Sequence, residues 1–288
     1  MQSTFITDEY SQDLSEVLQF AEARGVRSLE LRSIDGQHCS AVSRERLTAL
    51  RADLRGAGSS VCAIDSFAFK GAWSEDTFRT KGKEHVKRCL DVANLLEAPM
   101  LRVFAFWRDT APSLSAIAEQ LSELGEICAE RDVLIVVENG TFSEVGSGER
   151  LAALLEMLEG QRIMALWDPG NVINGGWEED VKSGLEALSG RVAHVHVKSP
   201  HRRDDGVVVF GPMCGGLIDF SDQLRQLAAQ HYTGFLSLET HWRKGHELIG
   251  RDKLDFPVGH EFSYAAAPAT EHMLGELNEL IANLGLEP

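Results

Sequence analysis

Long apolar runs and a secretory start are both missing from this sequence. No stretch of about 18 consecutive apolar residues occurs, so we expect no membrane-spanning helix. The segment Met1–Tyr10 lacks the basic residues and the apolar core that begin a secretory signal, which predicts a cytoplasmic location. The five cysteines are scattered without paired spacing, and this disfavours both a disulfide framework and a cysteine-based zinc site. These cysteines are Cys39, Cys62, Cys89, Cys128 and Cys214.

Basic residues are scarce relative to acidic ones. The chain has 28 lysines and arginines against 44 aspartates and glutamates, which gives a formal net charge of −16. A negative surface repels phosphate backbones, so we expect no nucleic-acid partner. The short basic stretch from Lys198 to Arg203 is an exception, because it could bind a single phosphate or carboxylate.

Linker-like and phosphate-binding sequences are also missing. No stretch rich in proline, serine or glycine divides the chain, so we predict one domain over residues 1–288. No glycine-rich turn follows the first predicted strand, whereas a doubly wound nucleotide-binding sheet would carry one there. That absence disfavours an open sheet.

What the sequence does contain is a regular alternation of strand-like and helix-like patterns. Helical spacing is clear in Leu114–Leu124, where apolar residues recur every three or four positions, and Ser43 is a suitable N-cap for another helix. Eight strand–helix units in a chain of this length predict an α/β fold, a single (β/α)8 TIM barrel. The predicted strands begin at Thr4, Ser28, Ser60, Met100, Val133, Ile163, Val192 and Phe235.

The segment Ala193–Ser199 alternates valine with polar residues, which is the period of a β-strand. His194, His196 and Lys198 therefore share one face of the strand, and the valines between them share the other. In a parallel sheet covered by helices, the face with the two imidazoles and the ammonium looks inward. Buried histidine and lysine are costly unless they are paired or ligated, so this strand is a candidate site. An exposed edge strand is the structural alternative.

Single carboxylates follow three other predicted strands. Glu138, Asp168 and Glu239 each come directly after an apolar segment. The carboxyl ends of barrel strands meet at one rim, so these side chains should lie near the imidazoles of His194 and His196. Three carboxylates and one imidazole suit Mn²⁺, Mg²⁺ or Co²⁺, whereas zinc usually has more nitrogen or sulfur ligands. Structural alternatives stay open, because Asp168 could cap the next helix and Glu138 could accept loop N–H groups.

A divalent ion at such a site predicts chemistry beside a carbonyl. An ion that bridges a carbonyl and a neighbouring hydroxyl acidifies the C–H bond between them and stabilises the enediolate that forms. Glu138 and Glu239 are the candidate catalytic bases that remove and return the proton. Lys198 or Arg202 would hold a developing oxyanion or a substrate carboxylate, although Lys198 could instead form a structural ion pair. Trp107 could wall the pocket against the C–H face of a sugar.

Three stretches, Trp167–Asn171, Arg191–Lys198 and Ile218–His241, occur in an order that resembles the xylose-isomerase-like superfamily of sugar isomerases and epimerases. The resemblance implies one divalent metal ion, with Mn²⁺ ahead of Mg²⁺, Co²⁺ and Zn²⁺, held by the last four strands. It makes His194 a deeper supporting or substrate-binding group. The implied metal ligands are Glu138, Asp168, His196 and Glu239.

The ketose epimerase branch of that superfamily implies further substrate contacts. Glu144 and Arg202 stand six residues after the first glutamate ligand and after the ligand histidine, respectively, where this branch contacts its substrate. Asn171 and His241 are further candidate substrate-binding residues. The chain departs from many members at Asn171, where they have histidine, and at Ser199, where they have an acidic residue.

Together these observations predict a metal-dependent isomerase or epimerase that acts on a small sugar or keto-polyol through a metal-stabilised enediolate. A dehydratase of a keto-polyol, such as an inosose or dehydroshikimate, begins with the same enolisation and stays open as the alternative. A DNA-repair endonuclease on this fold would need extra histidines where this chain has Asp65, Phe104–Phe106 and Asn171. A non-catalytic binding barrel would lack the full set of four ligands, Glu138, Asp168, His196 and Glu239, which we call the quartet. A homo-oligomer is compatible with the sequence, which does not determine the oligomeric state.

Overall fold

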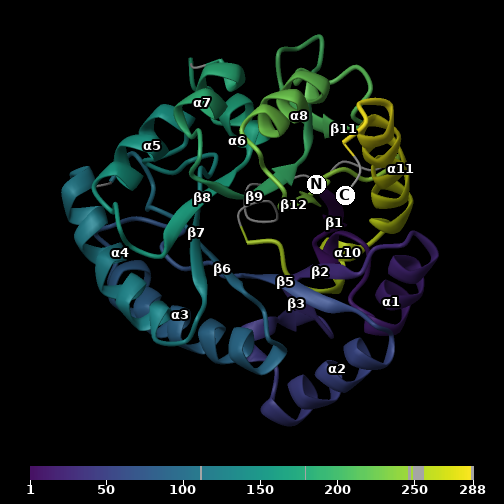
Figure 1. The fold of residues 1–288 in the computed structure, drawn as a ribbon, viewed down its shortest axis with the longest axis horizontal. Helices are drawn as coiled ribbons and strands as arrows, with labels where there is room; N and C mark the ends of the chain where they lie inside the picture. Colours follow the sequence, from purple (N-terminus) through teal and green to yellow (C-terminus); the bar gives the residue numbers. More distant parts are fainter. Residues whose placement is uncertain (111, 179, 246–247, 249–255, 287–288) are drawn as a thin grey trace.

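Eight parallel strands form the centre of the protein, and helices surround them (Figure 1). The structure is a computed structural model that describes residues 1–110, 112–178, 180–245, 248 and 256–286. The predicted (β/α)8 barrel is confirmed, with one strand near each predicted start. The strands are β1 (Gln2–Phe5), β2 (Ser28–Leu31), β5 (Ser60–Asp65), β6 (Met100–Val103), β7 (Leu134–Glu138), β8 (Ile163–Trp167), β9 (Val192–Val197) and β12 (Phe235–Leu238).

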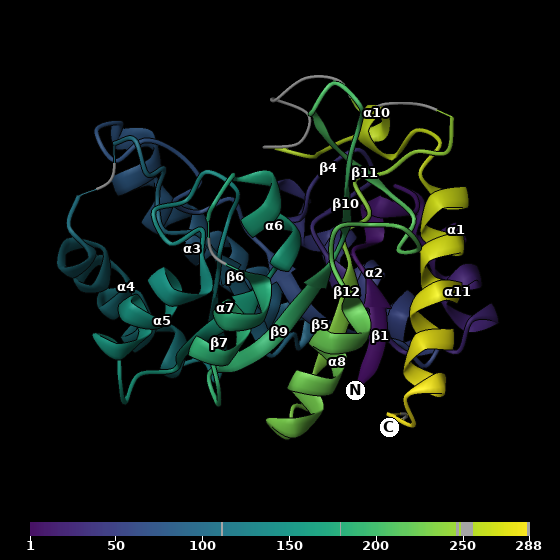
Figure 2. The same cartoon turned by 90° about the horizontal axis from the view of Figure 1, so that it is seen from above.

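The strands pair in the order β1-β12-β9-β8-β7-β6-β5-β2, so each barrel strand from β2 to β12 pairs with the next one along the chain, and β1 pairs with β12. Between β1 and β2 the described backbone has a single parallel bridge, from Ile6 to Glu30. The barrel is therefore closed by a short seam rather than by a full ladder. Figure 2 shows that the amino end of β1 lies at the opposite end of the barrel from the hairpins described below.

The outer helices form where the sequence has apolar periodicity and a capping residue. Ser43 and Ser113 accept hydrogen bonds from backbone N–H groups in the first turns of α2 and α4, as N-caps do. No described helix has both the length and the apolar composition needed to cross a membrane. The helices are α1 (Leu14–Ala23), α2 (Arg44–Gly56), α3 (Asp76–Leu96), α4 (Leu114–Ala129), α5 (Gly148–Glu156), α6 (Pro169–Asn174), α7 (Val181–Ala187), α8 (Phe220–Ala229), α10 (His260–Ser263) and α11 (Ala267–Asn283).

Two short antiparallel hairpins lie beyond the carboxyl ends of the barrel strands (Figure 2), and the sequence did not predict them. One joins β3 (Ser33–Ile34) to β4 (Gln37–His38), and the other joins β10 (Ser199–Arg202) to β11 (Val208–Gly211). Both follow directly after barrel strands, and their strands are only two or four residues long, too short for a hydrophobic period to mark them. They add walls around the rim where the site residues lie.

The barrel interior is apolar at one level and charged at the next. Val136 and Leu166 belong to a small buried cluster with Cys62, Ala63 and Met100, separate from the core under the helices. Side chains two residues apart on a strand share a face, so Glu138 and Asp168 lie next to this cluster, toward the carboxyl ends. The apolar cluster fills the barrel beneath them and keeps water from reaching the charged groups from that side.

Candidate metal centre and active site

The four residues expected to bind a metal meet at the carboxyl end of the barrel. Glu138 ends β7, Asp168 follows β8, His196 lies on β9 and Glu239 follows β12. One potential ligand atom from each lies within 4.8 Å of the others, and all four side chains are buried. The strand-end argument is therefore confirmed for their placement.

His196 has one nitrogen committed to a hydrogen bond and one directed at the carboxylates. Its Nε2 lies 3.0 Å from Glu30 Oε1, while its buried Nδ1 has no hydrogen-bond partner. That Nδ1 lies 3.6 Å from Glu239 Oε2 and 3.9 Å from both Glu138 Oε1 and Asp168 Oδ2. A carboxylate that binds the far side of a ligating imidazole is the usual outer partner in metal sites. The donor set and the unpartnered Nδ1 thus fit a divalent ion.

Charged neighbours hold the quartet carboxylates in place. Lys198 Nζ lies 2.6 Å from Asp168 Oδ2 and 2.5 Å from Glu239 Oε2, and Arg32 Nη1 lies 2.6 Å from Glu239 Oε1. Burial alone would raise the pKa of Glu239, but Lys198 and then His241 hold that pKa well below its usual value. Glu239 is therefore an ionised carboxylate. The ion-pair alternative for Lys198 is confirmed, and Lys198 also faces the cavity described below.

Asp168 combines a structural role with its place in the quartet. Its Oδ1 accepts a hydrogen bond from the Asn171 backbone N–H at 3.1 Å, so it is the N-cap of α6, as the structural alternative proposed. The Asn171 amide donates to Asp168 Oδ2 at 3.0 Å and to Glu138 Oε1 at 2.7 Å. A Cβ on Gly170 would lie 2.6 Å from the Lys198 side chain, so glycine is needed for this close approach. Glu138 is thus held by a side-chain amide.

Arg102 is a site residue that the sequence analysis missed. It lies on β6, and its Nη1 is 3.1 Å from Glu138 Oε2, 3.3 Å from Asp65 Oδ2 and 3.8 Å from Glu239 Oε1. Burial would raise the pKa of Glu138, but Arg102 and His196 lower it. Arg102 shares its strand face with Met100, so the alternation used for the histidine strand could have placed it inside the barrel.

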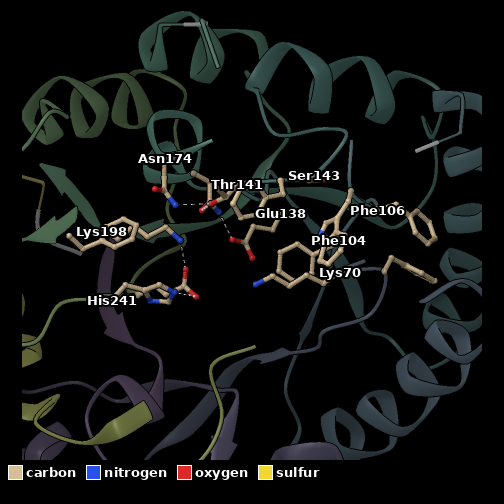
Figure 3. Close-up of a pocket in the computed structure, with 16 residues that line it drawn as sticks. Lys70, Phe104, Phe106, Glu138, Thr141, Ser143, Asn174, Lys198 and His241 are labelled. Carbon is tan, nitrogen blue, oxygen red and sulfur yellow. Dashed lines mark hydrogen bonds and ion pairs between the residues drawn. The ribbon is translucent and has the colours of Figure 1, made fainter. Parts of the chain in front are cut away.

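A cavity of about 270 Å³ opens beside the quartet. Figure 3 shows Glu138 and the Lys198 ammonium pointing into this space, with Phe104 and Phe106 beyond Glu138. Three lining residues, Phe69, Phe106 and His241, have positive φ angles of 63°, 59° and 45°. Such backbone conformations are strained for residues other than glycine and are concentrated at functional sites. The volume is close to the lower end for small-ligand pockets, about 300 Å³.

The predicted substrate-binding residues divide into three groups. Trp107, Asn171, Lys198 and His241 line the cavity. His194 lies deeper, where its Nε2 is 2.9 Å from Glu30 Oε2. The remaining two, Glu144 and Arg202, do not line it: Glu144 is paired with Arg150, and Arg202 is exposed on β10, where it donates to the Gly206 carbonyl.

Known proteins match both the sequence and the fold. A family of xylose isomerase-like TIM barrel proteins matches residues 12–262. The chain belongs to this family. Among curated proteins, the xylose isomerase-like chain is 26% identical over 149 residues to inosose dehydratase from Clostridium tetani (strain Massachusetts / E88). That match spans 46% of this chain and 46% of the dehydratase, so it covers about half of either protein.

Solved structures similar to this xylose isomerase-like barrel include two sugar epimerases. L-ribulose 3-epimerase aligns with a TM-score of 0.74 and 17% identity, over 99% of this chain and 96% of that one. The 3-keto-D-glucoside 4-epimerase from E. coli aligns with a TM-score of 0.69 and 15% identity, over 98% and 99%. At these identities the likeness concerns the fold.

Proposed function

We propose that this xylose isomerase-like barrel is a divalent-metal-dependent isomerase or epimerase of a small sugar or keto-polyol. The proposal rests on one observation: two residues of the quartet face the cavity and two are buried behind it. Glu138 and Glu239 line the cavity, whereas Asp168 and His196 are fully buried behind it. Two carboxylates thus face a bound substrate while they belong to a potential metal site. An ionised carboxylate that faces the substrate can remove a proton, and once protonated it can return that proton.

The metal would be held by Glu138, Asp168, His196 and Glu239, and Mn²⁺ suits this oxygen-rich set. When bound, a divalent ion polarises a carbonyl and lowers the pKa of the neighbouring C–H bond. The chain's own residues then supply orientation and proton transfer. Arg102 and Asn171 hold Glu138, and Lys198 and Arg32 hold Glu239, so neither carboxylate can rotate freely.

Glu138 and Glu239 are proposed as the groups that remove and return the proton. Both have a pKa below the usual value despite their burial, so each is ionised and able to accept a proton, and the carboxylate that accepts it is then the acid that returns it. Lys198 Nζ donates to the oxygen that gains negative charge on the substrate. Phe104 and Phe106 limit water in the cavity, which strengthens these charge interactions.

A keto-polyol dehydratase is the second candidate, and one finding favours it. The curated relative in Clostridium tetani is an inosose dehydratase. Elimination of water also starts with proton removal beside a carbonyl, so the same bases serve both reactions. The two reactions differ in whether the neighbouring hydroxyl stays on the product or leaves as water.

The test is to incubate the Mn²⁺-loaded enzyme with a panel of ketoses and keto-polyols in D₂O and analyse the products by mass spectrometry. We expect deuterium on the carbon beside the carbonyl. A product with the mass of the substrate, apart from the added deuterium, identifies an isomerase or epimerase. A product lighter by one water molecule identifies a dehydratase.

Glu138→Gln and Glu239→Gln test the bases at saturating Mn²⁺. Loss of a general base slows exchange by about 10²–10⁴-fold, so at least one variant should show this loss while metal remains bound. Glu159→Gln changes an exposed glutamate in the same way and should exchange at the wild-type rate. Wild-type exchange in both active-site variants would refute the assignment.

A further inference from the structure

A second group of potential metal ligands lies outside the quartet, where the turn Cys39–Ala41 meets helix α3. His38 ends β4, and His85 and Cys89 lie four residues apart on α3, so they share one face of that helix. One ligand atom from each of the three lies within 4.8 Å of the others. None of these residues belongs to the quartet.

The helix pair has the spacing of a tetrahedral site. Cys89 Sγ lies 3.6 Å from His85 Nε2. A zinc ion with Zn–N of about 2.0 Å and Zn–S of about 2.3 Å holds tetrahedral nitrogen and sulfur ligands roughly 3.5–3.6 Å apart. The Phe67 backbone N–H reaches the same His85 nitrogen at 3.3 Å, a long hydrogen bond that a metal–nitrogen bond would replace.

His38 is oriented as metal-bound histidines usually are. Its Nε2 lies 2.8 Å from the Asp65 carbonyl oxygen, which fixes the proton on Nε2 and leaves the Nδ1 lone pair for other partners. A backbone carbonyl in this position is a common outer partner of a ligating imidazole. Nδ1 now accepts a hydrogen bond from the Ser40 backbone N–H at 3.2 Å and contacts Ser40 Oγ at 2.8 Å, and a metal–nitrogen bond would replace both contacts. Cys39 Sγ lies 4.0 Å from Nδ1, so a second sulfur is close.

We propose that His38, His85 and Cys89, with Cys39 as the fourth side chain, form a second metal site that takes zinc. A thiolate with two imidazoles prefers a soft-to-borderline ion such as Zn²⁺, whereas the carboxylate-rich quartet prefers a harder one. The site ties the β4 turn to α3. Through the contacts of His38 with the Asp65 carbonyl and of His85 with Phe67, it also supports the rim of the barrel.

Cobalt titration of the reduced, metal-free protein tests this site separately from the proposed activity. Because the quartet contains no sulfur, a thiolate-to-cobalt charge-transfer band in the near ultraviolet reports only the second site. We expect about two equivalents of Co²⁺, one of which produces the band. Cys89→Ser and His85→Gln should each lose the band and about one equivalent. Cys214→Ser changes an exposed cysteine and should retain both.

A wild-type protein that takes up a single equivalent without the band would overturn the proposal, as would a Cys89→Ser variant that retains the band. Zinc X-ray absorption on the wild-type protein loaded with two equivalents needs no variant, so it decides even where a variant fails to fold. A sulfur shell at about 2.3 Å supports the site, and a shell of only nitrogen and oxygen refutes it.

Discussion

Replacing Glu30 with glutamine should weaken metal binding at a position that does not touch the metal. Glu30 is fully buried, and each of its two oxygens serves one imidazole, at 3.0 Å from His196 Nε2 and 2.9 Å from His194 Nε2. Glutamine keeps only one acceptor oxygen. One imidazole N–H must therefore face the new amide NH₂ group, and the negative charge that makes His196 a better ligand disappears.

The expected size of the effect follows from this loss. Removing an outer partner of a metal-bound histidine typically costs about 10–100-fold in metal affinity, which corresponds to roughly 1.4–2.8 kcal/mol. An unpaired buried N–H adds about 1–3 kcal/mol of lost stability. We therefore expect Glu30→Gln to bind Mn²⁺ at least ~10-fold more weakly and to unfold at lower urea concentration.

Mn²⁺ competition against a fluorescent chelator measures the affinity, and far-ultraviolet circular dichroism checks the fold. Glu276→Gln is the matched control, because each Glu276 oxygen also accepts one hydrogen bond, from the Met213 and Cys214 backbone N–H groups, and Glu276 lies on α11, outside the quartet. If a folded Glu30→Gln protein binds Mn²⁺ as tightly as the wild type, or if Glu276→Gln weakens binding equally, Glu30 does not act through His196.

Two further predictions concern metal removal and pH. Chelation should abolish turnover and leave the circular dichroism spectrum near native, because the core under the helices is separate from the site; global unfolding would instead make the ion structural. Glu9→Gln should lower the free energy of unfolding at neutral pH by about 3–5 kcal/mol, because Arg32 and Arg243 lose a buried partner. Burial raises the pKa of Glu9, but His241 and Arg243 outweigh it and hold that pKa below the usual 4.5. Glu9 thus stabilises the wild type above pH 4.5. The difference in the free energy of unfolding between the two proteins, measured in urea, should shrink as the pH falls below that value. A difference that stays constant would contradict the lowered pKa of Glu9.

The fold was predictable because buried parallel strands appear in the sequence as short apolar segments. Six strands begin at the predicted residues, namely β2, β5, β6, β8, β9 and β12. β7 begins one residue after the predicted Val133, and β1 begins two residues before the predicted Thr4. The hairpins were missed because strands as short as Ser33–Ile34 have no hydrophobic period. That residues 1–288 form one domain stays a prediction.

The quartet was predictable because each carboxylate follows an apolar strand directly. Glu30 and Arg102 were missed, since each lies in a short, mostly apolar strand and only the folded barrel shows that Glu30 contacts the histidines of β9 and Arg102 contacts Glu138 of β7. Glu144 and Arg202 were assigned from family spacing, but they lie in segments outside the barrel strands, whose path such spacing does not determine.

The cysteines show a different limit of sequence reasoning. Their scatter argued against zinc, yet folding brings Cys89 beside His38, which lies far away along the chain. Spacing along α3 was the available signal, because His85 and Cys89 are one helical turn apart. The other two side chains come from a turn that the sequence pattern did not predict.

The seam of the barrel determines when the site can form. β1 pairs with β12 over a separation of more than two hundred residues, and its other neighbour, β2, contributes one bridge at Glu30. During synthesis β1 therefore lacks its main pairing partner until β12 has left the ribosome. Glu239 emerges directly after β12. The quartet cannot exist in a partly made chain, so the proposed metal ion would bind only after ring closure. Until then, the unpaired edge of β1 is open to pairing with a neighbouring chain.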